Sequence, residues 1–224
     1  MISDRDFAQW CCALTEALSR EPLPGALAHR AMAPRPRQLA PPGGSNPPRP
    51  GGVLLLLHPD DEGICLPVTL RTEGVAYHKG QISLPGGMQE HGDANLADTA
   101  LRETFEEIGV RPEEVRILGK LTPLYVPASH SCIHPFVACH STKPLYRANP
   151  HEVAEVIELP LRTLMDPTAQ AEEEREIQGQ LVKVPFYWLK GHKVWGATAM
   201  ILSEFAAILA QRPELGRVPG LPAC

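Results

Sequence analysis

Hydrophobic residues recur at helical spacing in three stretches of the chain. A spacing of three and four residues places such side chains on one face of a helix, so each stretch predicts an amphipathic helix. The first covers residues 4–20, and the second lies between a candidate N-cap at Asn95 and a candidate C-terminal glycine at Gly109. The third covers residues 194–209, and a short fourth helix is predicted over residues 161–165.

Other apolar stretches are short and bounded by proline, glycine or polar residues, as strands are. The continuous apolar run at residues 53–57 predicts a strand buried on both faces. Residues 172–175 are all charged and predict a loop. Further strands are predicted over residues 64–70, 81–84, 115–121, 124–126, 135–140, 153–159 and 181–189, the last as an aromatic strand pair with a turn after it. Together these elements predict an α+β fold with a mixed β-sheet.

A length of 224 residues accommodates one sizeable domain with extensions. The proline-rich segment at residues 21–52 cannot hold a long helix or a central strand, because proline lacks the backbone N–H that both require. We therefore expect an N-terminal amphipathic helix over residues 1–20, a linker or surface belt over residues 21–52, one folded domain over residues 53–210 and a flexible tail over residues 211–224. The N-terminal helix is expected to pack on the core or on a second copy of the chain in a homodimer.

Composition narrows the classes of function. The formal net charge is −5, so no basic surface indicates a nucleic-acid partner. No apolar run approaches the roughly 18 residues of a membrane span, which predicts no membrane partner. The six cysteines show no C-x-x-C spacing and follow no secretory signal, so we expect reduced thiols in a cytoplasmic protein. A zinc site is not expected, despite nine histidines.

The second predicted helix carries three glutamates on one side. At roughly 100° per residue, Glu103, Glu106 and Glu107 lie at about 0°, 300° and 40°. Phe105 and Ile108 lie on the opposite, apolar side. A solvated acidic face is the simpler interpretation, but like charges four residues apart repel and weaken a helix. Three converging carboxylates suit a hard divalent cation such as Mg²⁺, which prefers oxygen ligands.

The stretch from Gly86 to Val110 resembles a Nudix box, a glycine-containing loop followed by Arg-Glu-x-x-Glu-Glu-x-Gly on a helix. Arg102 begins the second half, in which Thr104 occupies a position that is usually apolar. Fifteen positions separate Gly87 from Arg102, one more than the standard spacing. The first acid of the box is therefore Asp93 when counted from Gly87, but Ala94 when counted from Arg102, and the role of Asp93 stays open. The resemblance implies a Nudix hydrolase domain over residues 53–210, with a Nudix-type α/β/α sandwich fold.

A second motif lies directly upstream. Residues 67–87 resemble the signature of coenzyme A (CoA) pyrophosphatases within the Nudix superfamily. Ala76 stands where this signature has arginine, which can bind phosphate bidentately, so Arg71 or Lys79 would have to compensate. Residues 194–199 resemble the Trp-Gly-x-Thr-Ala start of the final helix in the same subfamily, and Trp195 is expected in the core. The matching positions of the upstream signature are Thr69, Arg71, Gly80, Pro85, Gly86 and Gly87.

The resemblance implies Mg²⁺-dependent (or Mn²⁺-dependent) hydrolysis of a diphosphate linkage in a small nucleotide, with CoA or its thioesters as the first candidates. It implies metal ligands at Glu103, Glu106, Glu107 and the carbonyl of Gly86. Catalytic roles fall to Glu103, Glu106 and, from a later loop, Glu152, with Glu155 as the second candidate for that loop. Substrate binding falls to Arg71, Lys79 and Gly87, and structural support of the glutamates to Arg102.

Several alternatives remain at this stage. Ser129, His130 and His134 fall in a predicted loop and could contact substrate or merely face solvent. The general base is not identified. Ala76 also favours ADP-ribose, NADH or dinucleoside polyphosphates as substrates in place of CoA. A non-catalytic Nudix domain that senses a nucleotide is a further alternative, which the intact set of three glutamates argues against.

Overall fold

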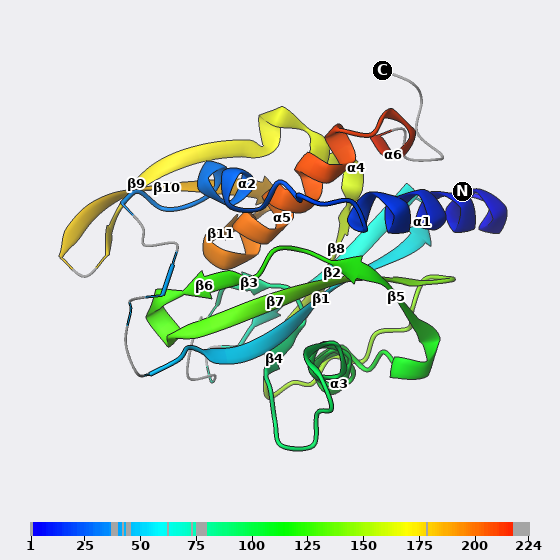
Figure 1. Ribbon diagram of the computed structural model, residues 1–224, viewed down its shortest axis with the longest axis horizontal. Helices are drawn as coiled ribbons and strands as arrows, with labels where there is room; N and C mark the ends of the chain where they lie inside the picture. Colours follow the sequence, from blue (N-terminus) through cyan, green and yellow to red (C-terminus); the bar gives the residue numbers. More distant parts are fainter. Residues whose placement is uncertain are drawn as a thin grey trace.

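The computed structural model describes residues 2–36, 40–41, 43, 46–61, 63–72, 74, 80–177 and 179–216. Its centre is a mixed β-sheet with helices on both faces (Figure 1). Strand β1 pairs parallel with β7 and antiparallel with β2 and β4, so the described chain has the predicted α+β fold with a mixed sheet. The eight strands of this sheet follow the order β3-β2-β1-β7-β5, with β4 on β1, β6 on β7 and β8 on β2. They are β1 (Arg49–Asp60), β2 (Gly63–Arg71), β3 (Ile82–Ser83), β4 (Gly86–Met88), β5 (Val115–Lys120), β6 (Leu124–Val126), β7 (Ser131–His140) and β8 (Val153–Pro160).

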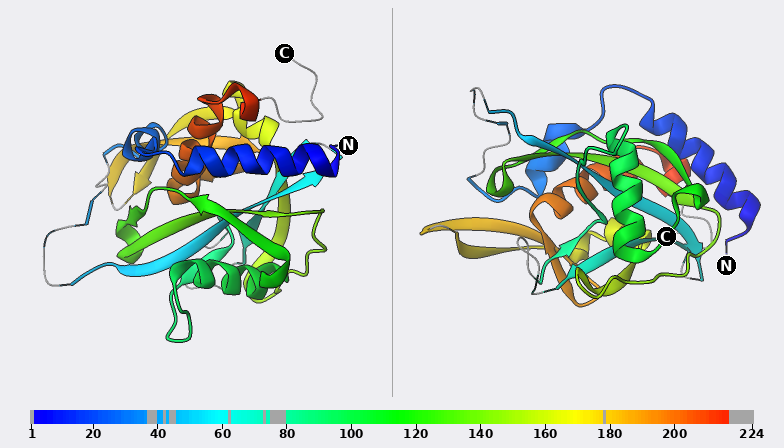
Figure 2. Two further views of the ribbon diagram at one scale, coloured as in Figure 1. Left: turned by 45° about the vertical axis from the view of Figure 1, so that its right-hand side comes forward. Right: turned by 90° about the horizontal axis from the view of Figure 1, so that it is seen from below.

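A second sheet of three antiparallel strands follows in sequence, and its hairpin extends past the body of the molecule (Figure 2). It consists of β9 (Gln170–Ile177), β10 (Gln180–Leu189) and β11 (His192–Trp195). The helices are α1 (Asp4–Leu18), α2 (Gly25–Ala31), α3 (Leu96–Ile108), α4 (Leu161–Met165), α5 (Gly196–Ala210) and α6 (Pro213–Gly216). Helix α3 lies on one face of the large sheet, whereas α1 and α5 lie on the other (Figures 1 and 2).

The apolar run at residues 53–57 lies in the middle of β1, which is covered on both faces. Leu54 and Leu56 pack with Ala100 and Ile108 in the layer next to α3. Leu55 and Leu57 belong to the larger core on the side of α1 and α5. Successive side chains of a strand point to opposite faces, so a strand covered on both faces buries all of them.

Helix α1 packs against its own chain. Its N-cap Ser3 accepts a hydrogen bond from the backbone N–H of Asp6, and the indole N–H of Trp10 donates to the carbonyl of Leu215 at 3.2 Å. The apolar face predicted from the sequence is buried, with Phe7 and Leu14 among its members. No helix among the described residues is both long and apolar enough to cross a bilayer.

Three local predictions are corrected by the structure. Residues 172–175 are not a loop but the middle of β9, where Glu173 pairs with Val184 of β10. Charged side chains are tolerated there because β9 is an edge strand with solvent beside it. Trp195 ends β11 and is not part of the last helix, because the positive φ of 66° at Gly196 turns the chain between the two. Strand β1 starts at Arg49, inside the proline-rich segment, since pairing with β7 extends that far.

Candidate active site

Helix α3 has the ends that its sequence predicts. The side-chain oxygen of Asn95 accepts hydrogen bonds from the backbone N–H groups of Ala97 at 2.9 Å and Asp98 at 3.1 Å. At the other end Gly109 is left-handed, with φ of 77°, and its N–H donates to the carbonyl of Phe105. These caps satisfy terminal backbone groups that a helix leaves unpaired.

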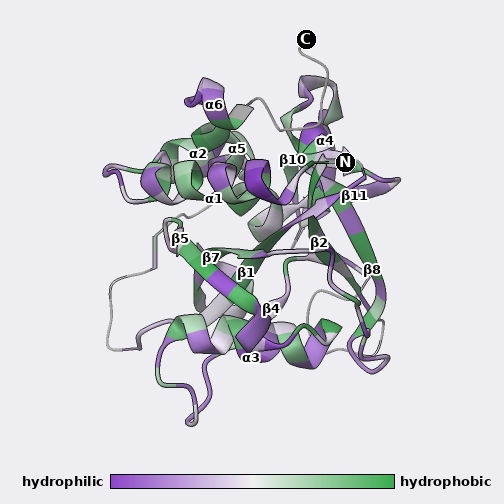
Figure 3. Cartoon of the chain, turned by 90° about the vertical axis from the view of Figure 1, so that its right-hand side faces the viewer, coloured by the Kyte–Doolittle hydropathy of each residue, from purple (hydrophilic) through white to green (hydrophobic). Residues whose placement is uncertain are grey.

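The buried face of α3 differs from the predicted one. Ala100, Thr104 and Ile108 are buried, whereas Phe105 is 48% exposed, so the expectation that Phe105 faces the core is wrong. The hydroxyl of Thr104 donates to the carbonyl of Ala100 at 2.6 Å, which lets a polar residue pack where an apolar one is usual. Hydrophobic and hydrophilic bands alternate along α3 (Figure 3). Glu107 is turned inward by this orientation.

Glu107 is the most buried of the three glutamates, at 1% exposed. Its carboxylate accepts hydrogen bonds from Nη1 of Arg71 at 3.2 Å and from the backbone N–H of Gly86 at 3.3 Å. Burial is the main cause that raises the pKa of Glu107 to about 7, with Arg71 opposing it. Three parts of the fold therefore meet at this carboxylate. They are Arg71 of β2, Gly86 of the glycine loop and α3, which carries Glu107.

Glu103 lies beside the glycine loop. Its side chain is 15% exposed, and burial raises the pKa of its carboxyl group. A Cβ atom added at Gly87 would lie less than 3.0 Å from the Glu103 carboxylate and would displace that carboxylate from its position. Gly86 has φ of 147°, and a Cβ there would meet the backbone of β1. The two glycines thus allow the loop to pass between β1 and the acidic face of α3.

Asp93, whose role the loop length left open, holds Arg102. The Arg102 guanidinium binds Asp93 through Nε at 2.9 Å and Nη2 at 3.0 Å. Hydrogen bonds from Arg102 hold the pKa of Asp93 well below its usual range. The same guanidinium reaches Glu103 at 3.2 Å and Glu106 at 2.9 Å. Arg102 therefore ties the loop to two of the three glutamates.

Glu152 lies close enough to the other acids to act on them. Its negative charge contributes to raising the pKa of both Glu103 and Glu107. The backbone N–H of Asn149 donates to the carbonyl of Glu107 at 2.9 Å, and the N–H of Thr72 donates to the carbonyl of Glu152 at 2.9 Å. Asn149 was not anticipated from the sequence, since a backbone contact leaves no sequence pattern.

The structure brings Glu103, Glu106, Glu107, Gly86, Gly87, Arg71, Arg102 and Glu152 into one region. Other candidates lie elsewhere or cannot be placed. Glu155 is exposed on β8, and Ala76 and Lys79 fall outside the described residues. His134 lies within β7 and not in the predicted loop. Ser129 ends a 3-10 turn, while His130 contacts Tyr125 at 3.0 Å and the carbonyl of Asn46 at 3.1 Å.

The chemistry of this donor set fits a hard divalent cation. All the acidic groups offer carboxylate oxygen, the donor type that Mg²⁺ and Mn²⁺ prefer. Burial, with a smaller contribution from neighbouring acids, raises the pKa of Glu103 and of Glu107, and a bound cation would favour their ionised forms. Among the described residues, no three acidic, histidine or cysteine side chains already converge at ion-binding distance. Glu103 and Glu106 instead contact Arg102, which must release at least one of them to a cation.

Comparison with known proteins shows the family of the chain. Residues 48–181 match the family model of the NUDIX domain. The chain belongs to the Nudix family. An uncharacterized Nudix hydrolase, NudL, from Pectobacterium atrosepticum is 32% identical over 161 residues, which cover 72% of this chain and 82% of the relative. The mitochondrial Nudix hydrolase 15 of Arabidopsis thaliana is 31% identical over 173 residues, covering 74% of this chain and 60% of the relative.

Solved structures support the fold. A MutT/nudix family protein from Enterococcus faecalis superposes with a TM-score of 0.51 at 16% sequence identity, covering 80% of this chain and 70% of that chain. The Nudix hydrolase RenU from M. smegmatis also gives 0.51, at 13% identity, covering 75% of this chain and 90% of that chain. The fold is the Nudix α/β/α sandwich. The protein is a Nudix pyrophosphohydrolase, of a family that cleaves diphosphate linkages in nucleotide derivatives, generally with a divalent metal ion.

Proposed function

We propose that this Nudix enzyme hydrolyses the diphosphate linkage of CoA or its thioesters with Mg²⁺ (or Mn²⁺). The observation that carries the proposal is the contact between Arg71 and Glu107 at 3.2 Å. Arg71 belongs to the segment that resembles the CoA pyrophosphatase signature, and Glu107 belongs to the Nudix box. The contact joins the two motifs at one point of the fold.

Arg71 is the proposed phosphate-binding residue. Its Nη1 atom binds Glu107, while its buried Nε atom has no hydrogen-bond partner among the described residues. A buried donor without an acceptor is costly, and a phosphate oxygen of the substrate would satisfy it. Gly87 is proposed to let the substrate approach the loop backbone. Lys79 remains a proposal from the sequence alone.

The glutamates and the Gly86 carbonyl are proposed to hold the cation. A bound divalent ion neutralises phosphate charge and lowers the pKa of bound water. Glu107 and Glu103 would supply oxygen ligands, and so would Glu106, whose carboxylate now contacts Arg102. Glu152 lies on the neighbouring loop and is proposed to accept a proton from the attacking water. Its charge, together with Glu103, concentrates negative potential where a proton is lost.

A second candidate function keeps the reaction and changes the substrate. Ala76 lacks the arginine of the CoA signature, which favours ADP-ribose, NADH or dinucleoside polyphosphates. A non-catalytic sensing role is disfavoured, because the buried, partly uncompensated carboxylates would then destabilise the fold without function.

A substrate panel separates these functions. Purified protein is incubated with CoA, an acyl-CoA, ADP-ribose, NADH and a dinucleoside polyphosphate, each with Mg²⁺ and with Mn²⁺. The proposal predicts the highest kcat/KM for CoA or acyl-CoA, with release of adenosine 3′,5′-bisphosphate and a 4′-phosphopantetheine. Intact CoA beside cleaved ADP-ribose or dinucleoside polyphosphate would refute the CoA assignment and retain the enzyme class.

We also propose the cytoplasm as its compartment, since the cysteines at positions 11, 12, 65, 132 and 139, those that the structure describes, form no disulfide. A homodimer stays a prediction. The apolar face of α1 that suggested one is used within the chain, through residues such as Trp10 and Cys11. Size-exclusion chromatography with light scattering measures the oligomeric state directly.

A further inference from the structure

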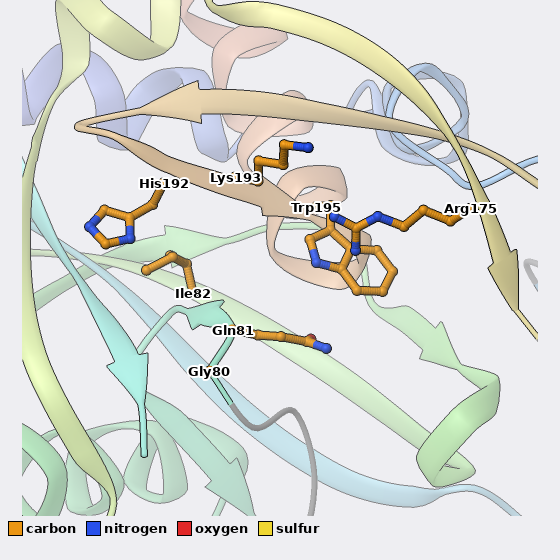
Figure 4. Close-up of a pocket in the computed structure, with 7 residues that line it drawn as sticks. All are labelled: Gly80, Gln81, Ile82, Arg175, His192, Lys193 and Trp195. Carbon is orange, nitrogen blue, oxygen red and sulfur yellow. The ribbon is translucent and has the colours of Figure 1, made fainter. Parts of the chain in front are cut away.

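A cavity of about 320 Å³ lies between β3 and the second sheet (Figure 4). Gln81 lines it from the side of β3. Arg175, His192, Lys193 and Trp195 line it from β9 and β11. The wall contributed by the second sheet is therefore aromatic and basic, although the chain as a whole is acidic.

Strand pairing places the basic and aromatic side chains on one face. Trp195 lies opposite Phe186, and Lys193 lies opposite Trp188. Directly opposed residues of an antiparallel pair point to the same side of a sheet. Val194, between them, points the other way and is 1% exposed in the core. The alternation is what a strand needs to bury one side and present Lys193 and Trp195 to a ligand.

The side chains on this face hold one another in position. The Arg175 guanidinium lies 4.7 Å from the centroid of the Trp195 ring, and Nζ of Lys193 lies 4.9 Å from that of Phe186. Glu173 accepts from both Arg175 and Lys193. Two cations share this one carboxylate, so the three groups carry a net positive charge. The side chains of Arg175 and Lys193 are 33% and 37% exposed, so they remain accessible to a ligand.

The cavity adjoins the active site through Arg71. Gln81, which lines the cavity, accepts a hydrogen bond at its carbonyl from the backbone N–H of Arg71 at 3.0 Å. The Arg71 side chain reaches Glu107 on the other side. The hydroxyl of Thr198, at the start of α5, donates to the carbonyl of Ile82 at 3.2 Å and fastens the cavity walls together. The cavity therefore lies one β-strand away from the residue that contacts Glu107.

We propose that this cavity binds the phosphorylated nucleoside end of the substrate, with the base on the Trp195–Arg175 pair and the ribose phosphate at Lys193. This inference rests on the proposed function. Bases stack on aromatic rings and on guanidinium planes, and phosphate monoesters pair with lysine and arginine. The pantetheine end of CoA is an uncharged amide chain and offers these cations no partner. The cavity thus determines which end of the substrate enters it, and it favours substrates that carry the extra phosphate on the ribose.

The expectation that Trp195 belongs to the core changes accordingly. Its ring is partly exposed beside the cavity and carries Arg175. The sequence motif at residues 195–199 then joins two functions in this proposal. Trp195 contacts the base, and Thr198 anchors the helix to β3.

Binding of product fragments tests the proposal without any turnover. Isothermal titration calorimetry in EDTA measures adenosine 3′,5′-bisphosphate and AMP, which differ by the ribose phosphate. Wild-type protein is expected to prefer the bisphosphate, and Lys193→Gln is expected to weaken bisphosphate binding by about tenfold, the size of one lost charge-assisted bond, with AMP unchanged. Trp195→Leu is expected to weaken both ligands. The matched control is Lys183→Gln, because Lys183 is 59% exposed and pairs with Glu172 away from the cavity.

Equal loss of both ligands in Lys193→Gln, or no loss of either, would overturn the proposal. Lys193→Arg keeps the charge and should retain the preference for the bisphosphate over AMP, which separates the effect of charge from a folding defect. If Lys193→Gln unfolds at a lower temperature than the wild type, Arg175→Gln serves as the second variant. Kinetics add an independent readout, since Lys193→Gln should raise KM for CoA and leave that for dephospho-CoA unchanged. Binding that depends on Lys193 in a protein that leaves CoA intact would refute only the substrate. CoA hydrolysis with unchanged bisphosphate binding would refute only the cavity.

Discussion

At the scale of single residues, Glu107 is held where ionisation is opposed. Its side chain is buried, and its acidic neighbours Glu103 and Glu152 add repulsion. Arg71 and the N–H of Gly86 offset part of this cost. A carboxyl group with a pKa near 7 can release its proton when a cation binds at neutral pH. The bound cation would then stabilise the ionised form that burial disfavours.

The metal-free protein should lose stability as Glu107 ionises. Its pKa is about 7 in the folded protein, above the ordinary value of 4.5, so its stabilising contribution is present below pH 4.5 and is lost as pH rises to 7. At 1.36 kcal/mol per pKa unit the loss is at most about 3 kcal/mol. Glu107→Gln cannot ionise, so urea unfolding in EDTA should show wild type losing stability relative to this variant between these pH values. A constant difference across that range would contradict the assignment.

Residue-level predictions from the sequence succeeded where the signal was local. Asn95 and Gly109 cap α3 as expected, because capping depends on neighbours along the chain. The inward face of the helix was not predictable, since Phe105 is apolar but exposed and Thr104 is polar but buried. Hydropathy alone does not reveal that Thr104 satisfies its hydroxyl on the helix backbone. Asp93 was uninterpretable for a similar reason, as its partner Arg102 is nine positions away across an irregular loop.

At the scale of elements, the site depends on how closely α3 approaches β1. Gly52 makes this approach possible. A Cβ atom added there would lie less than 3.0 Å from the carbonyl of Leu96, at the start of α3. Gly52 is also paired with Gly87 of the active-site loop. Gly52 therefore sets how closely both α3 and the active-site loop approach β1.

Gly52→Ala should displace α3 and weaken both fold and catalysis. The Leu96 carbonyl belongs to the backbone and cannot move alone, so overpacking should lower the free energy of unfolding by about 1–3 kcal/mol. Hydrolytic activity should fall with it, because the glutamates move relative to Arg71. Gly92→Ala is the matched control, since a Cβ there meets nothing within 4 Å. Chemical denaturation and kcat/KM measure the two effects, and equal behaviour of the two variants would disprove the close-approach account.

The second sheet was predicted only in part from the sequence. The aromatic strand β10 was expected, but the charged stretch at residues 172–175 was expected to be a loop. Its pairing with β10 comes from a partner strand and not from its own composition. The basic and aromatic cavity between β3 and β11 was equally hidden, because it brings together residues more than a hundred positions apart.

At the scale of the whole molecule, a buried glutamate joins the N-terminal segment to the sandwich. Glu204 of α5 is fully buried and accepts hydrogen bonds from the N–H of Gly25 at 3.0 Å and from the hydroxyl of Thr122 at 2.6 Å. His29 of α2 contacts it at 3.0 Å. The short helix α2, the turn between β5 and β6, and α5 therefore share one acceptor. Gly25 and His29 of the proline-rich segment are held at this point, an arrangement that composition did not indicate.

Glu204→Gln should destabilise the fold and leave the chemistry intact. An amide presents an N–H to groups that themselves donate, so a buried network loses bonds at a cost of about 3 kcal/mol. Thermal or chemical denaturation should show this loss, while kcat measured on folded protein well below the transition should stay near the wild-type value. Glu214→Gln, at a side chain 56% exposed, is the control for removing a charge. A large fall in kcat with unchanged stability would contradict this division between fold and site.

The central claim is that the acidic face of α3 binds the cation for phosphoanhydride hydrolysis, and Glu106→Gln tests it most directly. The Glu106 side chain is 48% exposed, so the free energy of unfolding should change by no more than about 0.5 kcal/mol. Release of adenosine 3′,5′-bisphosphate from CoA with Mg²⁺ should fall by about 10²-fold or more, while Glu113→Gln, outside the site, should match wild type. EDTA should abolish hydrolysis by the wild type. Unchanged turnover by Glu106→Gln, or hydrolysis that persists in EDTA, would contradict the account.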